Sequence, residues 1–398
     1  MAERFITLAE VSFDGKGSYG IGASAVPYSE DLYTYLRITD INDDGTLNLN
    51  DLKSVDDEKA KDYLLKPNDI VFARTGASTG RNYFYDGSDG EFVYAGFLIK
   101  FSIDDKKINP KYVKYYCQSS DYKGWINSFN TGSTRGNINA QTLGKMPIPL
   151  LERKQQDNLV SILSSIDGKI KTNNKINNNL EQQMQALFNK YVSSNEFHNL
   201  TTVENVVLTA NTGADAIQKA PIVDYDTGIR CIRVGDMTNS RSFYEWGFTK
   251  VTDEVFKRYQ LHKDDIVVTR TAALGLNTII PEDLSAVYNN GLIRLTVDTS
   301  RILPLYLYRQ FQTEDFANYI ARIESETSVR PNMKINYLLK YEFVLPPIEK
   351  QGELIELLTP MLNQQNNLIS ENKKLESLRD TLLPKLMSGE IDVSTIEI

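Results

Sequence analysis

A short polar loop with two arginines is the part of the sequence best suited to bind another molecule. Residues 74–81 read RTGASTGR and follow a strand-like apolar run at residues 70–73. A loop of small residues can enter a DNA groove, where arginine donates two hydrogen bonds to guanine and serine or threonine donates to phosphate. The alternative is a hairpin turn in which Arg74 forms an ion pair inside its own domain. The sequence leaves both interpretations open.

Two other glycine-rich segments also carry polar side chains. Residues 131–137 read TGSTRGN, and this segment is matched by residues 324–332. Residues 15–22 contain the pattern G-x-G-x-x-G. This pattern suggests a dinucleotide or S-adenosylmethionine loop, but it lacks the preceding buried strand, the following helix and the later acidic residue of such sites. Its counterpart at residues 210–215 lacks the glycine pattern, so we expect a flexible loop that faces DNA or solvent.

Some of these polar side chains recur in the second half of the chain. Arg74 recurs as Arg270, and Arg135 recurs as Arg330. A side chain that is kept while the surrounding loops diverge is more typical of the scaffold or of a phosphate contact than of a base reader. The candidate DNA contacts are Lys16, Ser18, Tyr19, Arg74, Thr75, Ser78, Thr79, Arg81, Arg135, Asn137, Lys219, Arg270, Thr271, Asn277, Arg330, Asn332 and Lys334.

The recurrence extends over nearly half the chain. Residues 65–75 match residues 261–271, and residues 148–155 match residues 345–351, with offsets between 194 and 198. A repeat of this length predicts two similar domains, because solenoid repeats are only 20–50 residues long. We place the first domain at residues 1–150 and the second at residues 196–347.

An arginine precedes an aspartate by three residues at the same place in both copies. The two pairs are Arg37 with Asp40 and Arg233 with Asp236. This spacing predicts an internal ion pair in each domain.

Each repeated half is followed by a long helical pattern, which we assign to residues 151–195 and, with a C-terminal tail, to residues 348–398. Apolar residues recur at intervals of three and four, which is the periodicity of a coiled coil. An antiparallel pairing that places Leu159 opposite Leu386 also places Asn173 opposite Asn372. A polar layer of this kind fixes the register of the helices. The predicted seam contains Leu159, Leu163, Ile166, Ile170, Asn173, Leu180, Met184, Leu187, Leu354, Leu358, Met361, Leu368, Asn372, Leu375, Leu382 and Leu386.

The composition restricts the chemistry that the chain can perform. Its 398 residues include only two histidines and two cysteines, Cys117 and Cys231, which lie at non-equivalent places in the repeat. A zinc site, a histidine-dependent catalytic triad and a conserved disulfide are therefore not expected. No signal peptide and no apolar run of membrane-spanning length is found, which favours the cytoplasm. The net charge of −8 argues mildly against nucleic-acid binding, although binding needs only a local basic face.

The order of these features resembles the specificity subunit of type I restriction–modification systems. The resemblance rests on residues 68–76, 148–156, 345–351 and 382–391, in this order around two long helices, and it covers the whole chain. It implies two target-recognition domains that each read half of a split DNA site. It also implies that the helices set the gap between the half-sites and dock two methyltransferase subunits, with restriction subunits in the larger complex. The second copy departs from the pattern, since Ala272 stands where the first copy has Gly76.

We therefore predict a non-catalytic DNA-specificity subunit with a mixed α/β (α+β) fold, built from two repeated domains and an antiparallel coiled coil. It needs no cofactor of its own, and S-adenosylmethionine is expected on the methyltransferase partner. No ATP-binding loop or amino-methyltransferase motif is found in the sequence. Two alternatives remain: a self-contained DNA methyltransferase or nuclease with unfamiliar motifs, and a coiled-coil scaffold that binds only proteins.

Overall fold

A computed structural model describes residues 4–49, 51–129, 137–194, 199–239, 241–326 and 332–394 of the chain. It divides into two compact units. The first unit comprises Met1–Asn173 and Ser370–Ile398, and the second comprises Asn174–Ile369. The boundary between the units falls within both long helices.

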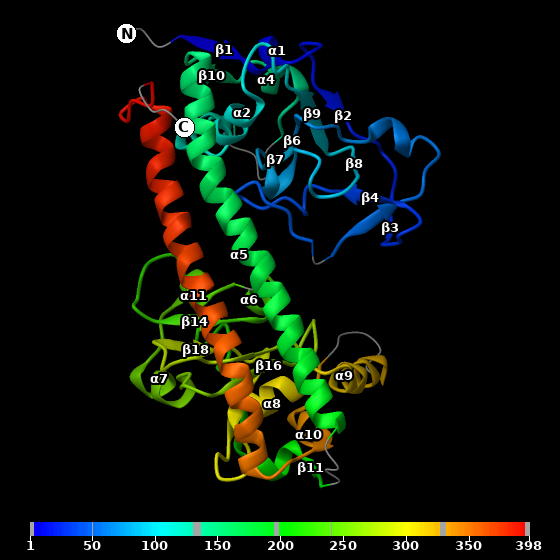
Figure 1. Ribbon diagram of the computed structural model, residues 1–398, viewed down its shortest axis with the longest axis vertical. Coiled ribbons are helices and arrows are strands. Elements are labelled where there is room, and N and C mark those ends of the chain that lie inside the picture. The colour runs from blue at the N-terminus through cyan, green and yellow to red at the C-terminus, as the bar shows by residue number, and fades with distance from the viewer. Residues whose placement is uncertain are drawn as a thin grey trace. The chain divides into compact units, whose positions relative to one another are not determined.

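The first unit begins with a series of short strands and helices (Figure 1). Its strands are β1 (Phe5–Thr7), β2 (Ser18–Tyr19), β3 (Ala25–Pro27), β4 (Tyr33–Leu36), β5 (Lys53–Val55), β6 (Asp69–Ala73), β7 (Asn82–Tyr85), β8 (Phe92–Tyr94), β9 (Leu98–Ser102) and β10 (Pro147–Pro149). Its helices are α1 (Leu8–Val11), α2 (Pro110–Tyr116), α3 (Ser120–Asn127), α4 (Ala140–Gly144) and the 3-10 helices η1 (Ala60–Tyr63) and η2 (Gly76–Ser78). The long helix α5 (Arg153–Ser194) comes next.

The second unit repeats this order of elements. Its strands are β11 (Leu200–Thr202), β12 (Val207–Thr212), β13 (Ile222–Val223), β14 (Arg230–Ile232), β15 (Phe248–Thr249), β16 (Ile266–Thr269), β17 (Asn277–Ile279), β18 (Ala286–Tyr288), β19 (Leu292–Val297) and β20 (Glu342–Val344). Its helices are η3 (Val203–Val206), α6 (Val234–Thr238), η4 (Phe243–Glu245), α7 (Asp253–Tyr259), α8 (Pro304–Gln310), α9 (Glu314–Glu326), α10 (Ile335–Leu339) and α11 (Ile348–Met387).

The sheet topology confirms the internal repeat. The first unit has the strand orders β1-β10, β2-β9-β6-β7 and β3-β5-β4-β8. The second has β11-β20, β12-β19-β16-β17 and β13-β15-β14-β18. Every strand of the first unit thus has a counterpart ten strands later. Even the single parallel pairing of the smaller four-stranded sheet, β4 with β8, recurs as β14 with β18.

The apolar runs in the middle of each copy form strands that are covered on both faces. All five residues of β6 are buried. Ile70 and Phe72 join the core beneath the short helices, whereas Val71 and Ala73 join a second core against the smaller sheet. The side chains of a strand alternate between its two faces, so residues 70–73, which lie between two cores, are all apolar. In β16, Val268 and Val267 divide between two cores in the same way.

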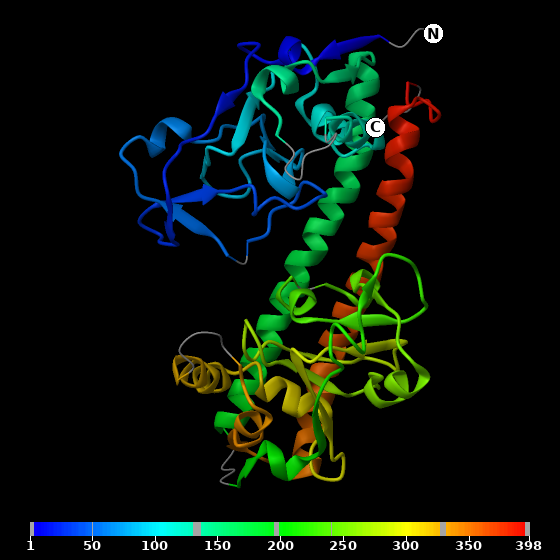
Figure 2. The ribbon, with the colours of Figure 1, turned by 180° about the vertical axis from the view of Figure 1, so that it is seen from behind.

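The two long helices contain 42 residues in α5 and 40 in α11. All sixteen predicted seam residues are buried or half-buried. Within the first unit, the Asn173 amide donates to Asn372 Oδ1 at 2.8 Å, which confirms the predicted register. In both views the long helices lie alongside the globular part of each unit (Figures 1 and 2). Helix α11 ends just before Gly389, whose φ of 73° suits the left-handed end of a helix.

The glycine-rich segment at residues 15–22 is not the flexible loop that we predicted. Ser18 and Tyr19 form β2, which pairs with β9. A Cβ atom on Gly20 would lie 2.2 Å from the Tyr94 carbonyl oxygen, and one on Gly213 would lie 2.3 Å from the Tyr288 carbonyl oxygen. These glycines therefore let two strands approach closely, and Gly213 preserves this role although the rest of the glycine pattern is absent from the second copy.

Candidate nucleic-acid interface

The loop at residues 74–81 and its counterpart in the second copy share two left-handed backbone positions. Gly76 and Gly80 have positive φ angles of 73° and 88°, and Ala272 and Gly275 have φ angles of 63° and 79°. Ala272 thus keeps the left-handed conformation of Gly76 despite its side chain, which shows that the role of this glycine is retained. A Cβ atom on Gly80 would lie 2.5 Å from Ile126, so the loop also packs tightly against α3.

A second segment fixes each loop from the other side. Thr75 forms a β-bridge with Asn137, and Thr271 forms the same bridge with Asn332. The peptide N–H that follows each of these asparagines donates to the carbonyl of the loop arginine, at 2.9 Å for Arg74 and 2.7 Å for Arg270. The candidates Arg135 and Arg330 lie outside the described residues.

The guanidinium of Arg270 is held inside its own domain. It donates to the Met333 and Asn290 carbonyl oxygens, both at 3.1 Å, and to Asn332 Oδ1 at 2.8 Å. This geometry supports the scaffold interpretation for the second copy. The Arg74 guanidinium instead lies over the ring of Tyr19, with its central carbon 4.9 Å from the ring centroid.

Arg81 and Asn277 also use their polar groups within the chain. Arg81 donates to the Asp43 carboxylate at 2.7 and 3.2 Å and to the Ile41 carbonyl at 3.2 Å. The Asn277 amide donates to the Gly275 and Phe311 carbonyls and accepts a hydrogen bond from Gln312. Both side chains therefore shape the loop from inside the domain.

The other candidates differ in how accessible they are. Exposed side chains are Lys16, Tyr19, Asn137, Lys219, Asn332 and Lys334, and half-buried ones are Ser18, Thr75, Ser78, Thr79 and Thr271. Ser18 Oγ lies 3.0 Å from the hydroxyl of Tyr94, and Thr79 donates to the Gly76 carbonyl at 2.8 Å. Lysine is thus the candidate type that remains most available to a ligand in both copies.

A buried carboxylate at the start of the strand that leads into each loop was not among the predicted site residues. Asp69 accepts hydrogen bonds from Ser102 and from the Lys66 N–H and pairs with Lys100 at 3.2 Å. Its counterpart Asp265 accepts from Thr296 and from the His262 N–H, and Arg294 replaces the lysine at 3.9 Å. The basic side chains also lie over buried tyrosine rings, Tyr94 and Tyr288. Burial raises the pKa of Tyr288 to about 12.

The predicted ion pair between an arginine and the following aspartate holds in only one copy. Arg37 pairs with Asp40 at 2.6 Å. In the second copy this prediction is wrong, because the Arg233 guanidinium donates to the Cys231 and Ala220 carbonyls and Asp236 pairs with Arg241 at 3.3 Å. What both copies share is a hydrogen bond from the arginine backbone N–H to the aspartate, at 2.8 and 2.9 Å.

Each globular domain is fastened to the long helices by an acidic residue of α5. In the first unit, Asp167 accepts from Lys114 at 3.0 Å and from the Tyr115 hydroxyl at 2.9 Å, and it pairs with Arg379 of α11 at 3.5 Å. Burial opposes the ionisation of Asp167, but attraction to Lys114 and Arg379 outweighs it and keeps the pKa of this carboxyl below its usual value.

The second unit makes the equivalent attachment with different side chains. Arg309 of α8, only 1% exposed, forms an ion pair with Glu181 of α5 and contacts Met184 Sδ at 3.5 Å. Gln365 of α11 reaches the same glutamate at 3.3 Å. Both units therefore attach the globular domain through an acidic residue of α5 and a basic partner, although the residues themselves differ.

A buried glutamine at the start of each long helix makes a further attachment. Gln156 accepts from the Asn109 N–H and Gln351 accepts from the Leu303 N–H, both at 2.8 Å. These contacts correct the repeat alignment at this place, because Gln156, and not Gln155, is the counterpart of Gln351. The sequence match had placed this glutamine one residue too early in the first copy.

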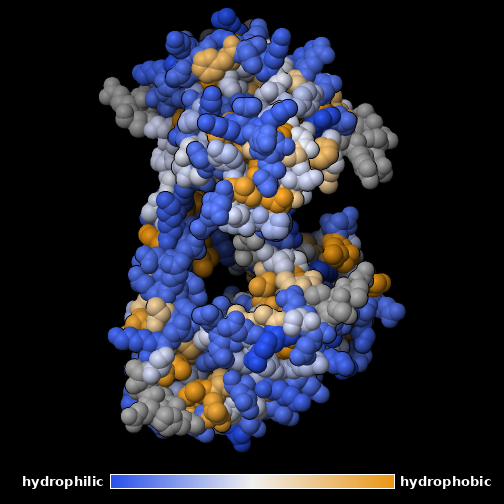
Figure 3. Space-filling view, turned by 90° about the vertical axis from the view of Figure 1, so that its right-hand side faces the viewer, coloured by the Kyte–Doolittle hydropathy of each residue, from blue (hydrophilic) through white to orange (hydrophobic). Residues whose placement is uncertain are grey.

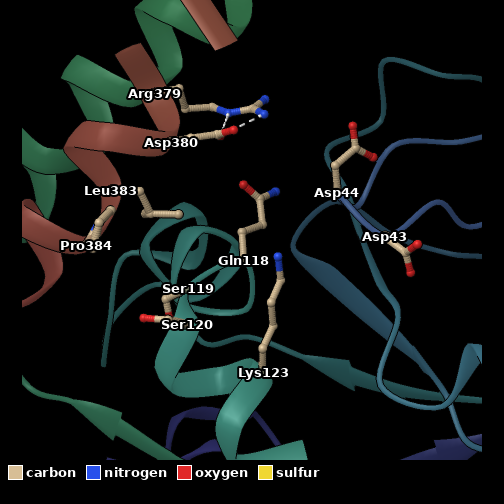
Figure 4. Close-up of a pocket in the computed structure, with 10 residues that line it drawn as sticks. All are labelled: Asp43, Asp44, Gln118, Ser119, Ser120, Lys123, Arg379, Asp380, Leu383 and Pro384. Carbon is tan, nitrogen blue, oxygen red and sulfur yellow. Dashed lines mark hydrogen bonds and ion pairs between the residues drawn. The ribbon is translucent and has the colours of Figure 1, made fainter. Parts of the chain in front are cut away.

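The described residues contain little that could hold a small cofactor. They include no group of three or more histidine, cysteine, aspartate or glutamate side chains that could bind a metal ion. Cys117 and Cys231 are buried free thiols. A hollow of about 420 Å³ in the first unit is lined by mixed charges, including Asp43, Lys123 and the pair Arg379 and Asp380 (Figure 4). Mixed charges of this kind do not form the single-sign cluster that a phosphate group would need.

The face drawn in Figure 3 is mostly hydrophilic, with hydrophobic residues in separate patches. Among the described residues, no helix combines the length and the apolarity needed to cross a membrane.

The chain is thus built from two diverged copies of one domain, and in each copy a second segment fixes the arginine loop through a β-bridge. Comparison with known proteins identifies the family. Residues 27–182 and 209–378 match the family described as "Type I restriction modification DNA specificity domain". The chain belongs to this family and carries two copies of its domain. Proteins of the family supply DNA specificity and are not themselves catalytic, so the expectation of a non-catalytic chain is confirmed.

Individual relatives resemble the chain over most of its length. It is 23% identical over 404 residues to the specificity subunit of the type I restriction enzyme StySPI from Salmonella potsdam, covering 92% of this chain and 84% of the relative. It is 20% identical over 356 residues to the MjaVIII specificity subunit from Methanocaldococcus jannaschii, covering 84% and 82%. The crystal structure of the S subunit from M. genitalium superposes with a TM-score of 0.49 and 14% identity, covering 97% and 96%.

Proposed function

We propose that each of the two domains reads one half of a bipartite DNA site, and that the long helices fix the gap between the half-sites. The observation that carries the proposal is a shared framework with diverged surfaces. The strand order, the left-handed loop and the buried aspartate recur in both units, whereas the exposed side chains around them differ. Such divergence is expected when one scaffold has been adapted to two different base sequences.

The helices suit the function of a spacer. Their seam residues are buried or half-buried along the whole predicted stretch, and the Asn173–Asn372 layer opposes any slip of one helix along the other. Each α-helical residue advances about 1.5 Å, so the length of the helices converts directly into a distance along DNA.

We further propose that the helices dock two methyltransferase subunits, and that restriction subunits join the larger complex. S-adenosylmethionine would then be bound by the methyltransferase subunits. Leu357, Ile369 and Leu378 of α11 support this docking surface, because they are large apolar side chains about half exposed on a helix whose seam is already filled. Solvent-exposed apolar side chains of this kind are suited to burial against a partner.

The decisive experiment replaces the exposed loops of the first domain, within residues 1–150, with those of a relative and maps methylated sites across a genome. One half-site should change while the other half-site and the gap stay the same. A change in both half-sites would contradict the assignment of one domain to one half-site. Methyl transfer from labelled S-adenosylmethionine by the purified chain alone would instead support a self-contained methyltransferase.

A further inference from the structure

The loop arginine has different surroundings in the two copies, although its backbone is held in the same way. The Arg74 N–H donates to the Phe97 carbonyl at 3.0 Å, and the Arg270 N–H donates to the Gly291 carbonyl at 2.9 Å. The two loops thus present their arginines from equivalent positions. Any difference between the side chains must come from the residues around them.

In the second copy, the guanidinium donates hydrogen bonds to three acceptors within its own domain. Its three hydrogen bonds, to Met333, Asn290 and Asn332, use all three of its nitrogen atoms. The neighbouring turn leaves no room for a side chain, since a Cβ atom on Gly291 would lie 2.8 Å from Val234. Arg270 is therefore a brace that ties two loops together.

In the first copy, the guanidinium has no hydrogen-bond acceptor among the described residues. Nε of Arg74 is buried without a hydrogen-bond partner, and no hydrogen bond or ion pair from its other nitrogens is found within the described part of the chain. Its observed neighbour is the ring of Tyr19. A cation over an aromatic face is held in place, but its N–H groups still need acceptors.

The residues around Arg74 are also more exposed and more aromatic than those around Arg270. Tyr19 is 42% exposed, and its hydroxyl accepts a hydrogen bond from the Ala140 N–H at 3.2 Å, which fixes the ring. Phe97 is 59% exposed at the position where the second copy has Gly291. Strand register places Thr212 at the position of Tyr19, because Tyr19 pairs with Ile99 and Thr212 pairs with the equivalent Ile293. The second copy therefore lacks both rings.

We propose that the Tyr19–Arg74 pair is a DNA contact of the first domain that has no counterpart in the second. The ring of Tyr19 orients the guanidinium, and the donors of Arg74 bind paired acceptor atoms of the duplex. Phosphate oxygens and the O6 and N7 atoms of guanine both offer such acceptors. The inference rests on the proposed DNA-reading function. It also separates the two arginines, which their retention in both copies had suggested would act alike.

The test compares matched substitutions in the two copies. Arg74→Gln and Arg270→Gln are introduced separately into the full chain, which is then assembled with its methyltransferase subunits. Binding to cognate and altered duplexes is measured by fluorescence anisotropy over a range of salt concentrations, and thermal unfolding of each chain is recorded. Tyr19→Leu is a third variant that removes the ring and leaves the arginine.

Arg74→Gln should weaken cognate binding by roughly tenfold to a hundredfold, as expected for loss of a forked arginine contact, without lowering the unfolding temperature. Arg270→Gln should lower the unfolding temperature, because it removes three internal hydrogen bonds. Tyr19→Leu should weaken binding in the same direction as Arg74→Gln. A salt slope reduced by about 0.9 identifies phosphate as the acceptor, whereas an intact slope with tolerance at one base pair identifies guanine.

The inference is overturned if Arg74→Gln or Tyr19→Leu binds cognate DNA as tightly as the unchanged chain, or if Arg74→Gln unfolds as readily as Arg270→Gln. If the unchanged complex itself fails to distinguish cognate from altered duplexes, then the proposed function has failed, and not only this inference. If Arg74→Gln does not fold, Arg74 is a brace like Arg270 and the inference is wrong.

Discussion

The polar layer in the helix seam leads to a prediction about both stability and register. The Asn173 side chain is completely buried, and its amide donates to Asn372 and to the Glu371 carboxylate, both at 2.8 Å. In Asn173→Leu these bonds are lost, and Asn372 keeps a buried amide that has lost this partner. Replacing both asparagines by leucine instead gives an apolar layer.

The magnitude of the effect can be worked out from these two bonds. A neutral hydrogen bond contributes about 0.5–1.5 kcal/mol and one to a charged group about 1.5–3 kcal/mol, and the half-exposed Glu371 belongs at the low end. Asn173→Leu should therefore cost about 2 kcal/mol, which lowers the unfolding temperature of a unit of this size by roughly 4–8 °C. Asn372→Leu removes the bond between the two asparagines but not the one to Glu371, and should cost about 1 kcal/mol. The double substitution should recover most of this loss or exceed the original stability, as buried polar groups often cost stability.

Thermal unfolding followed by circular dichroism measures these changes, and Asn178→Leu serves as a control because Asn178 is an exposed position of the same helix. The control should unfold within about 1 °C of the unchanged chain, since surface substitutions are nearly neutral. The reasoning is refuted if the single variants match the control, or if the losses simply add in the double variant.

Three further predictions concern other parts of the chain. Ala272→Gly should stabilise the second domain by about 1 kcal/mol, since alanine is strained at a φ of 63°. Gly76→Ala should destabilise the first domain by a similar amount. Unfolding midpoints in denaturant equal to that of the unchanged chain would contradict both expectations. The lowered pKa of Asp167 contributes stability that is complete above its unfolded value near 3.9 and is lost as the pH falls through the folded value. Asp167→Asn should therefore flatten the acid side of the stability–pH curve, and an unchanged curve would show that the ion pairs with Lys114 and Arg379 contribute nothing. Inserting four residues within 173–180 should lengthen the helix by about 6 Å and rotate the second domain by about 40°. Methylation mapping should then find both half-sites unchanged and the gap between them altered. An unaltered gap in an active complex would refute the proposal that the helices act as a spacer.

Much of the architecture could be predicted because it depends on local pattern. The spacing of apolar residues predicted both long helices and their seam, and the position of two asparagines predicted the register that the hydrogen bond between Asn173 and Asn372 confirms. The matching runs at residues 65–75 and 261–271 predicted the repeat because buried strands tolerate few changes. These features need no knowledge of distant contacts.

The interior of the site depends on contacts between distant segments, and the sequence did not reveal it. Asp69 stood within a repeated run, but its partner Lys100 lies on another strand. Asp167 and Glu181 attach the globular domains to the long helices, but they come from a helix whose exposed face carries many similar polar side chains. Retention of a residue type was also a poor guide to its role, since Arg74 and Arg270 share a backbone position and differ in every observed side-chain contact.

The glycine-rich segment shows why motif matches need structural context. The pattern at residues 15–22 resembled a phosphate loop, yet Gly17 and Gly20 are required by a strand pairing. A Cβ atom on Gly17 would meet the ring of Phe101 at 2.6 Å. A sequence pattern alone does not distinguish a glycine that admits a ligand from one that admits a neighbouring strand.

The central claim is that two equivalent domains each read one half-site at a gap set by the helices. The most direct test replaces residues 200–344 of the second domain with residues 5–149 of the first and maps the methylated sites of cells that express the resulting chain. The account predicts a bipartite site whose two half-sites have the same sequence, which is that of the first domain, at an unchanged gap. A site that keeps the half-site of the second domain would contradict it.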